Sequence, residues 1–459
     1  MCIEREIHGD TELTDVAKLF FGDDIPKITL SFDGSFFCVK IDGNEYVYNY
    51  SDSVYNIIPE AHRVGRLSKI AVYDALSAFT NRTMPWGALT GVRPTKLFYE
   101  CLFAGKSRQG AIDTMQKVYR ISEKRAKVLS AIANAQDGKI HFGDDCVNLY
   151  VHIPFCTTRC SYCSFLSLPI DKHNKLSKDY VKYLCDEIAL TRDTIDKLGK
   201  KVLSVYIGGG TPSALSPELL DKVLTAIRDY GVEYTCEAGR PDTITAEKCD
   251  IIKSHGVTRV CVNPQTLNDK TLSLIGRNHT ADEFFGAYEI VKSRGFEINC
   301  DLIAGLPGET LSDFKASYDK IKSLRPQNFT VHSLAKKNGS AIRYEQSENG
   351  DTETMLNYAL DNAGEYVPYY LYRQKRQSGN VENVGFSMPS KECINNITTM
   401  EETVSVVACG AGAISKTVCG GEIKRFANMR DVILYISRFA ECSERKTNFL
   451  LNSFKLIRR

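Results

Sequence analysis

Residues 146–165 read CVNLYVHIPFCTTRCSYCSF, an apolar run that leads directly into a loop with three cysteines. The first eight residues have the β-branched and aromatic content of a buried strand. Similar runs recur up to residue 335, and stretches whose apolar residues have helical spacing separate them. The other runs are LSVYIGG at 203–209, EYTCEA at 233–238, TRVCVNP at 258–264, FEINCDLIAG at 296–305 and NFTVHSLA at 328–335.

The segments between these runs are predicted to be helices, near residues 179–192, 217–230 and 246–255, on both sides of Arg277, and over 311–324. Six strand-helix repeats are typical of a parallel α/β barrel or partial barrel. We therefore predict an α/β fold with a partial (β/α)6 barrel over residues 146–345. Active sites in such barrels lie on loops that leave the C-terminal ends of the strands, which is where the cysteine loop falls.

The segments on either side of the barrel have different patterns. Residues 1–145 are predicted to be a small N-terminal α+β domain, because residues 27–50 alternate around two Asp-Gly turns and helical spacing follows at 62–79, 109–115 and 123–135. Residues 346–459 are rich in Tyr, Asn and Gly, and they are predicted to be an irregular C-terminal extension with a final helix around 431–440.

Composition excludes several classes of protein. The chain has 459 residues, 43% hydrophobic and 25% charged, with a net charge of +2, which argues against disorder and against an electrostatic nucleic-acid binder. No apolar stretch reaches the roughly 18 to 20 residues that a membrane span needs. Glu4, Glu6 and Asp10 stand where a secretory signal would be basic and then apolar. We expect a cytoplasmic protein without a membrane span.

The chain contains 16 cysteines, and only Cys156, Cys160 and Cys163 cluster, with the spacing C-x3-C-x2-C. Structural zinc sites and four-iron clusters both normally take four protein ligands, so this set is one short. A 4Fe-4S cluster on three thiolates would leave one iron open for an exogenous ligand. Three structural or zinc-binding cysteines are the alternative.

Seven motifs in order resemble the oxygen-independent coproporphyrinogen III dehydrogenase family of radical S-adenosylmethionine (SAM) enzymes. They are YVHIPFC, YIGGGTPS, CEAGRPD, NPQTL, IGRNHT, DLIAGLPGE and VHSLA. Further stretches resemble the longer Z-type members of this family and extend the resemblance over nearly the whole chain. These stretches are MPWGALTGVRPTKL, YYLYRQK and GNVENVGF.

The resemblance implies a 4Fe-4S cluster on Cys156, Cys160 and Cys163, SAM as cofactor, and an electron donor such as flavodoxin or ferredoxin. It implies SAM contacts at the positions that match the family motifs, namely Tyr150, Gly209, Gly210, Thr211, Glu237, Gln265, Arg277, Asp301 and Ala335. Tyr162 is expected to pack over the cluster and to lie near a second SAM. A glycine turn, a helix cap or a surface charge is the alternative for each of these residues taken singly.

The implied substrate is a tetrapyrrole, coproporphyrinogen III, whose propionates become vinyl groups, and the C-terminal region is expected to cover it. Tyr366, Tyr369, Tyr370 and Tyr372 with nearby cations suit a tetrapyrrole, and a packed aromatic cluster is the alternative. Ser164 and Phe165 depart from the Gly-Cys pair of decarboxylating members, and SMPSKECINNI at 387–397 departs from Z-type members. A haem-binding carrier and a radical SAM enzyme that opens or alkylates haem therefore stay as alternatives.

Overall fold

The computed structural model describes residues 5–91, 93–335, 351–374 and 381–455. The chain forms two compact units. The first consists of Met1–Ala135 and Leu371–Glu382, and the second of Gln136–Tyr370 and Asn383–Arg459. The division of the second unit into a barrel and a substrate-covering region stays a prediction.

The first unit contains an antiparallel sheet with the order β1-β2-β3-β4. The strands are β1 (Arg5–Glu6), β2 (Ile28–Phe32), β3 (Phe36–Ile41) and β4 (Asn44–Asn49), so the predicted meander is confirmed. Asp42 and Gly43 have φ of 45° and 85°, the left-handed geometry that a tight hairpin requires. The helices are α1 (Thr11–Phe21), α2 (Arg63–Thr80), α3 (Pro94–Phe103), α4 (Arg108–Tyr119) and α5 (Glu123–Ala135).

A buried polar cluster fixes the returning segment Leu371–Glu382 inside the first unit. The indole Nε1 of Trp86 donates to Glu382 Oε2 at 2.6 Å, and Arg125 Nε lies 2.7 Å from Glu382 Oε1. The guanidinium of Arg373 stands 5.5 Å from the centre of the Trp86 ring and donates to the Leu89 carbonyl. These four side chains are almost fully buried, so Arg373 and Glu382 are part of the core of the first unit.

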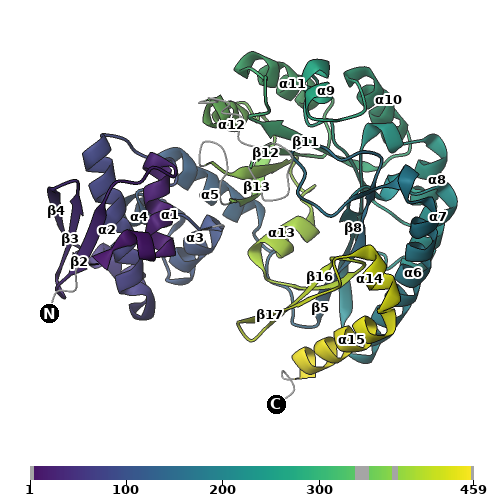
Figure 1. Cartoon of the computed structure of the whole chain (residues 1–459), viewed down its shortest axis with the longest axis horizontal. Helices are drawn as coiled ribbons and strands as arrows, with labels where there is room; N and C mark the ends of the chain where they lie inside the picture. Colours follow the sequence, from purple (N-terminus) through teal and green to yellow (C-terminus); the bar gives the residue numbers. More distant parts are fainter. Residues whose placement is uncertain (1–4, 92, 336–350, 375–380, 456–459) are drawn as a thin grey trace. The chain divides into compact units, whose positions relative to one another are not determined.

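The second unit is built on six parallel strands in the order β5-β8-β9-β10-β11-β12. They are β5 (Cys146–Ile153), β8 (Lys201–Gly209), β9 (Glu233–Gly239), β10 (Arg259–Val262), β11 (Glu297–Ala304) and β12 (Asn328–Ser333). The helices between them are α6 (Asn174–Lys197), α7 (Pro217–Ile227), α8 (Ala246–Ser254), α9 (Asp269–Leu274), α10 (Ala281–Lys292) and α11 (Leu311–Ser323). Figure 1 shows helices along the outside of this curved sheet, and the predicted partial (β/α)6 barrel is confirmed.

The sheet continues beyond both ends of the six strands, so the C-terminal region is more regular than its sequence indicated. β14 (Asn383–Ser387) pairs antiparallel with β12, and β13 (Val367–Tyr372) follows it. At the other end β15 (Ser405–Cys409) pairs parallel with β5, and β16 (Ile414–Cys419) and β17 (Glu422–Ala427) follow. The helices of this region are α12 (Asp351–Asp361), α13 (Ile394–Glu401), α14 (Val432–Ser437) and α15 (Phe439–Lys455).

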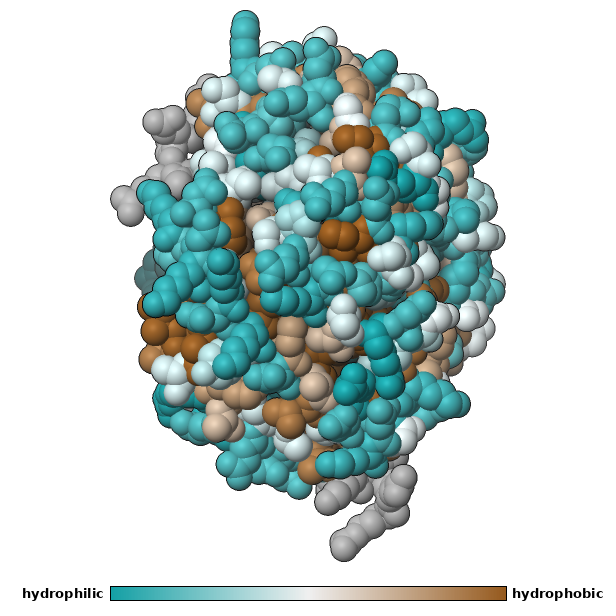
Figure 2. Space-filling view, turned by 90° about the vertical axis from the view of Figure 1, so that its right-hand side faces the viewer, coloured by the Kyte–Doolittle hydropathy of each residue, from teal (hydrophilic) through white to brown (hydrophobic). Residues whose placement is uncertain are grey.

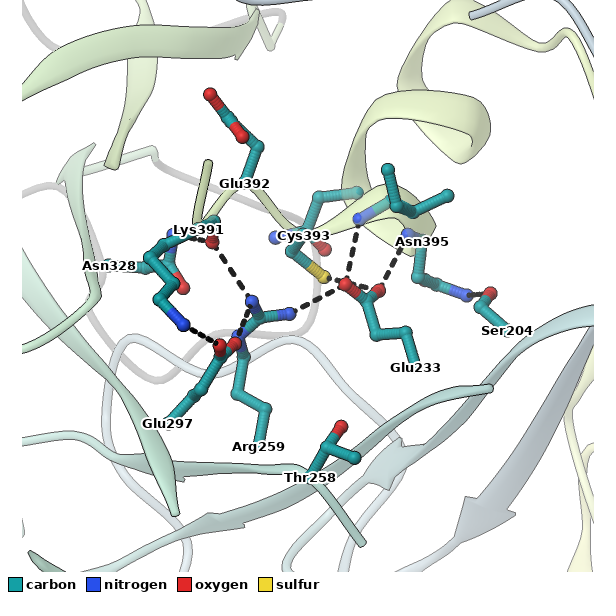
Figure 3. Close-up of polar contacts among 12 residues, drawn as sticks. Ser204, Glu233, Thr258, Arg259, Glu297, Asn328, Lys391, Glu392, Cys393 and Asn395 are labelled. Atoms are coloured by element: carbon teal, nitrogen blue, oxygen red, sulfur yellow. Dashed lines mark hydrogen bonds and ion pairs between the residues drawn. The ribbon is translucent and has the colours of Figure 1, made fainter. Parts of the chain in front are cut away.

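An ionic network lies where the parallel strands of the barrel begin, and Figure 3 shows it. Arg259 of β10 bonds Glu233 of β9 at 2.8 Å and Glu297 of β11 at 2.6 Å. Glu233 also accepts hydrogen bonds from the backbone N–H groups of Ile394 and Asn395, at the start of α13. The C-terminal region therefore closes the floor of the barrel with paired charges.

The outer face of the second unit is mostly polar. Figure 2 shows this side as largely hydrophilic, with hydrophobic residues in separate spots rather than in one band. This is the surface that amphipathic helices leave when their apolar stripes face the sheet. Of the helices that the structure describes, none has the length and apolar character to cross a membrane.

Candidate active site

The three clustered cysteines lie on the loop that follows β5. Cys156 ends the short strand β6 (Phe155–Cys156), and the Cys163 N–H bonds the Cys160 carbonyl at 3.1 Å to form a turn. The loop is anchored to the turn after α9, because the Ser161 N–H donates to the Ile275 carbonyl at 3.0 Å. The loop is therefore held against the segment that carries Arg277.

Two guanidinium groups lie beside the Cys160 thiol. Arg240 Nη1 is 3.6 Å from Cys160 Sγ, and a salt bridge of 2.9 Å to Asp242 orients it. Arg277 is also a hydrogen-bonding neighbour of Cys160, and it is 8% exposed. Two cations therefore stand beside a cysteine of the loop, where they could offset the negative charge of a metal cluster held by thiolates. The sequence predicted Arg277 here but assigned no role to Arg240, although Arg240 lies within the quoted motif CEAGRPD.

The glycine run at the end of β8 packs directly on the cysteine loop. The Gly210 N–H donates to the Ile153 carbonyl, and the Thr211 N–H donates to the Phe155 carbonyl, both at 2.7 Å. A Cβ at Gly210 would lie 2.4 Å from the Phe155 carbonyl oxygen, so no side chain fits there. The Thr211 hydroxyl lies 3.3 Å from Cys156 Sγ. Burial raises the pKa of the Cys156 thiol, and this hydroxyl opposes the increase.

Two carboxylates project into the barrel from β9 and β11. Glu237 accepts a hydrogen bond from the Tyr206 hydroxyl at 3.0 Å, and Asp301 accepts one from the Asn299 amide at 2.9 Å. Burial, and then the negative charge of Asp301, raise the pKa of Glu237 to about 7. The two carboxylates are thus close enough to influence each other across β10, which lies between their strands.

Gln265 combines an unusual backbone conformation with a buried side-chain amide. It has φ of 68°, and its backbone bridges β11 through bonds to Asp301 and Ile303 at 2.9 Å. Its side chain is 8% exposed, and the amide Oε1 has no hydrogen-bond partner among the described residues. A buried acceptor without a partner is costly unless a ligand uses it.

The aromatic and small residues predicted for the site lie around these groups. Tyr150 stacks on Tyr206 with 6.2 Å between ring centres, and its hydroxyl is 3.1 Å from Nδ1 of His152. Tyr162 packs against an apolar cluster that consists of Ile275, Ile303, Leu306 and Leu334. Ala335 is half-buried and directly follows Leu334, whose N–H bonds the Ala304 carbonyl at the end of β11.

The tyrosines proposed to face a tetrapyrrole are instead largely part of the core. Tyr366, Tyr369 and Tyr370 on or next to β13 are buried. The Tyr366 hydroxyl donates to the Pro326 carbonyl at 2.7 Å, and the Tyr369 hydroxyl accepts from Asn396 at 3.0 Å. The packed aromatic cluster, left open by the sequence, is what the structure shows for these three residues.

The donor set suits the cofactors that the motifs predicted. Three thiols on one loop, two neighbouring guanidinium groups, side-chain-free backbone at Gly209 and Gly210, and the unpartnered oxygen of Gln265 line one end of the barrel. Within the described residues, no three His, Cys, Asp or Glu side chains are arranged around a single metal ion.

Comparison with known proteins places the chain in a family. A model of the Radical SAM superfamily matches residues 150–321. The oxygen-independent coproporphyrinogen-III oxidase-like protein HemZ of Bacillus subtilis is 36% identical over 401 residues, which cover 83% of this chain and 80% of that protein. The chain therefore belongs to the radical SAM superfamily and, within it, to the HemZ-like family of coproporphyrinogen-III oxidase-like proteins. The cofactors of the superfamily, and of this chain, are a 4Fe-4S cluster and SAM.

Other relatives are related to haem. The heme chaperone HemW of Escherichia coli is 26% identical over 325 residues, covering 68% of this chain and 83% of that protein. HemW of Bacillus subtilis is 37% identical over 200 residues, which cover 40% of this chain and 49% of that protein. Among solved structures, coproporphyrinogen III oxidase (HemN) from Escherichia coli has a TM-score of 0.53 at 20% identity, covers 68% of this chain and 73% of its own, and shows the shared fold.

Proposed function

We propose that the chain is a radical SAM oxidoreductase of porphyrin metabolism. Its reaction is the oxidative decarboxylation of two propionates of coproporphyrinogen III to vinyl groups, which gives protoporphyrinogen IX. The observation that carries this proposal is the 36% identity to HemZ over most of both chains. The fold shared with HemN supports the same chemistry.

The reaction balances if an electron acceptor is present. Each propionate loses a hydrogen atom from its β-carbon, one molecule of carbon dioxide and one electron, and a vinyl group is left. When bound, the cluster and SAM supply the 5′-deoxyadenosyl radical that takes the hydrogen atom. The electron that reduces the cluster comes from a donor such as flavodoxin or ferredoxin.

The residues of the barrel mouth have distinct tasks in this proposal. Cys156, Cys160 and Cys163 hold the cluster, while Arg240 and Arg277 stabilise its negative charge. The acceptor oxygens orient SAM by binding its hydroxyl and ammonium groups, and the fixed barrel wall excludes water from the reacting atoms. The residues that would contact SAM are Tyr150, Gly209, Gly210, Thr211, Glu237, Gln265, Arg277, Asp301 and Ala335, with Tyr162 over the cluster and near a second SAM.

A second function is a haem carrier that keeps the cluster but performs no decarboxylation. The similarity to HemW chaperones favours it. The segment after the third cysteine is a further argument, because Phe165 is 60% exposed where decarboxylating enzymes have a Cys. An exposed aromatic ring next to the cluster suits a flat apolar ligand. A radical SAM enzyme that opens or alkylates haem would use the same surface.

One anaerobic incubation separates these functions. The reconstituted protein is mixed with coproporphyrinogen III, SAM, a reductant and an electron acceptor, and the products are read by mass spectrometry. Loss of two carboxyl groups, together with 5′-deoxyadenosine and methionine, is expected. An unchanged tetrapyrrole, combined with stoichiometric haem binding, would contradict decarboxylation and support the haem carrier. A ring-opened or alkylated haem would instead support the radical SAM enzyme that modifies haem.

A further inference from the structure

A histidine faces one of the two carboxylates inside the barrel. β11 and β12 are parallel, and their register sets Asp301 beside Thr330 and Ile303 beside His332. The imidazole Nε2 of His332 lies 3.6 Å from Asp301 Oδ2, which is within ion-pair distance. The Asp301 side chain is 14% exposed and that of His332 26%, so the pair is partly shielded from water.

The Asp301 carboxylate is held in place from several directions. Its Oδ1 accepts from the Asn299 amide, and its backbone N–H donates to Asn263 Oδ1 at 3.2 Å. Burial alone would raise the pKa of Asp301, but His332 and the hydrogen bonds from Asn299 and Thr330 hold it below its ordinary value. Asp301 is therefore ionised at neutral pH.

Glu237 lies in the opposite situation. Its one described hydrogen bond comes from the Tyr206 hydroxyl, and burial together with the charge of Asp301 raises the pKa of Glu237 to about 7. His332 opposes this increase. When two carboxyl groups have environments that separate their pKa values, the one with the higher value carries the exchangeable proton. In this pair that group is Glu237.

The other ionisable groups around His332 lie at a small cavity and are paired or buried. A cavity of about 100 Å³ lies below the pair, and Arg259 at its floor is neutralised by Glu233 and Glu297. Burial raises the pKa of three further groups that line this cavity, namely Tyr206, Cys261 and Cys393. The Tyr370 hydroxyl, also at the cavity, pairs with Thr330 Oγ1 at 3.1 Å.

We propose that His332 is a positioning residue for SAM: it holds the Asp301 carboxylate oriented toward the ligand, and the positive charge of bound SAM then draws a proton from Glu237. SAM carries a sulfonium and an ammonium group, and positive charge beside Glu237 favours its ionised form. This inference rests on the SAM site proposed above. It adds His332 to the residues that the motifs implied for the SAM site.

The test measures SAM binding and proton release rather than turnover. Calorimetric titration of the reconstituted, unreduced protein with SAM in two buffers of different ionisation enthalpy gives the number of protons released. Wild type should release a measurable fraction of a proton at pH 7, because the raised pKa leaves part of the Glu237 population protonated at this pH. His332→Leu should bind SAM about tenfold more weakly at pH 7, and its affinity should recover only at higher pH.

His332→Gln and His255→Leu are the matched variants. Gln keeps a donor for Asp301, so the affinity of His332→Gln should stay within about threefold of wild type. His255 also pairs with an aspartate, Asp221 at 2.8 Å, but its partner lies on α7, and His255→Leu should leave both measurements unchanged.

The outcomes separate this inference from the proposed function. Wild type that does not bind SAM contradicts the SAM site itself. SAM binding without proton release, or an unchanged affinity and pH profile in His332→Leu, overturns the role of His332 alone. If His332→Leu fails to take up iron, the role of His332 is judged from the number of protons that wild type releases and from the SAM affinity of His332→Gln. Wild type that releases no proton refutes the coupling between SAM binding and Glu237 ionisation.

Discussion

The imidazole of His152 lies against the backbone of Gly209: a Cβ at Gly209 would be 2.6 Å from both Cε1 and Nδ1 of the ring. Gly209 also has φ of 106°, which side-chain-bearing residues rarely adopt. The end of β8 can therefore pack against β5 only without a side chain at this position.

Gly209→Ala should weaken SAM binding at least tenfold and lower the free energy of unfolding by about 1–3 kcal/mol, because the new Cβ meets a buried ring and the backbone is strained. Binding titration and thermal unfolding measure the two effects. Gly231→Ala is the control, since Gly231 has φ of 67° but no atom within 4 Å of the added Cβ. Equal SAM affinity in both variants would argue against close packing at Gly209.

Cys160→Ala should abolish binding of the 4Fe-4S cluster, because two ligands cannot hold a cluster that already has an open iron. Iron and acid-labile sulfide are measured after anaerobic reconstitution, along with the visible absorption of the cluster. Cys185→Ala on α6 should retain full iron content, since Cys185 lies outside the cysteine loop. Unchanged iron in Cys160→Ala, or stoichiometric zinc in wild type, would contradict the cluster assignment.

Arg259→Ala should lower the free energy of unfolding by about 3–5 kcal/mol, because it leaves two glutamates at the barrel floor without their shared cation. Urea unfolding monitored by circular dichroism measures this loss. Arg325→Ala breaks an exposed pair with Glu365 and should change stability little. Similar unfolding midpoints in the two variants would show that the floor network in Figure 3 adds no stability.

Stability should depend on pH through Glu309, whose pKa burial raises to about 7. A raised carboxyl pKa means that the folded state binds the proton more tightly than the unfolded state. The contribution of Glu309 to the free energy of unfolding is therefore fully present below about pH 4.5. It is lost as the pH rises to about 7, and the total loss is about 3 kcal/mol.

Glu309→Gln should consequently equal wild type in stability at pH 5 and exceed it at pH 8. Denaturant unfolding at both pH values measures the difference. Glu289→Gln on the exposed face of α10 should track wild type at both. A Glu309→Gln variant that is less stable than wild type at pH 8 would reverse the sign and refute the buried, protonated carboxyl.

The strand-helix alternation predicted the six-stranded barrel because parallel strands have apolar runs that differ clearly from amphipathic helices. The same reasoning missed β14 and β15. Both are short and all five residues of each are buried, so neither shows the alternation that marks an edge strand. α1 and α3 were missed as well, although Asp10 caps α1 through bonds to two backbone N–H groups and Pro94 begins α3.

The sequence predicted the site residues that lie in recognisable motifs. It did not predict residues whose role depends on a partner that is distant in the sequence. The cysteine spacing and the glycine run directly predicted Cys156, Cys160, Cys163 and Gly210 as site residues, and the structure places Gly210 against the cysteine loop. Arg240 and His332 were not predicted, because their roles depend on neighbours 80 and 31 residues away, Cys160 and Asp301. The position of Arg240 within the motif CEAGRPD was the one feature of the sequence that could have indicated its place in the site.

The contact between Trp86 and Glu382 spans 296 residues of sequence. During synthesis, Trp86 and Arg125 leave the ribosome long before Glu382 exists, and most of the barrel emerges in between. The first unit can therefore complete its core only after most of the second unit has been made. A nascent chain arrested before residue 371 should show a protease-sensitive first unit, and the order of assembly runs from the middle of the chain to its beginning.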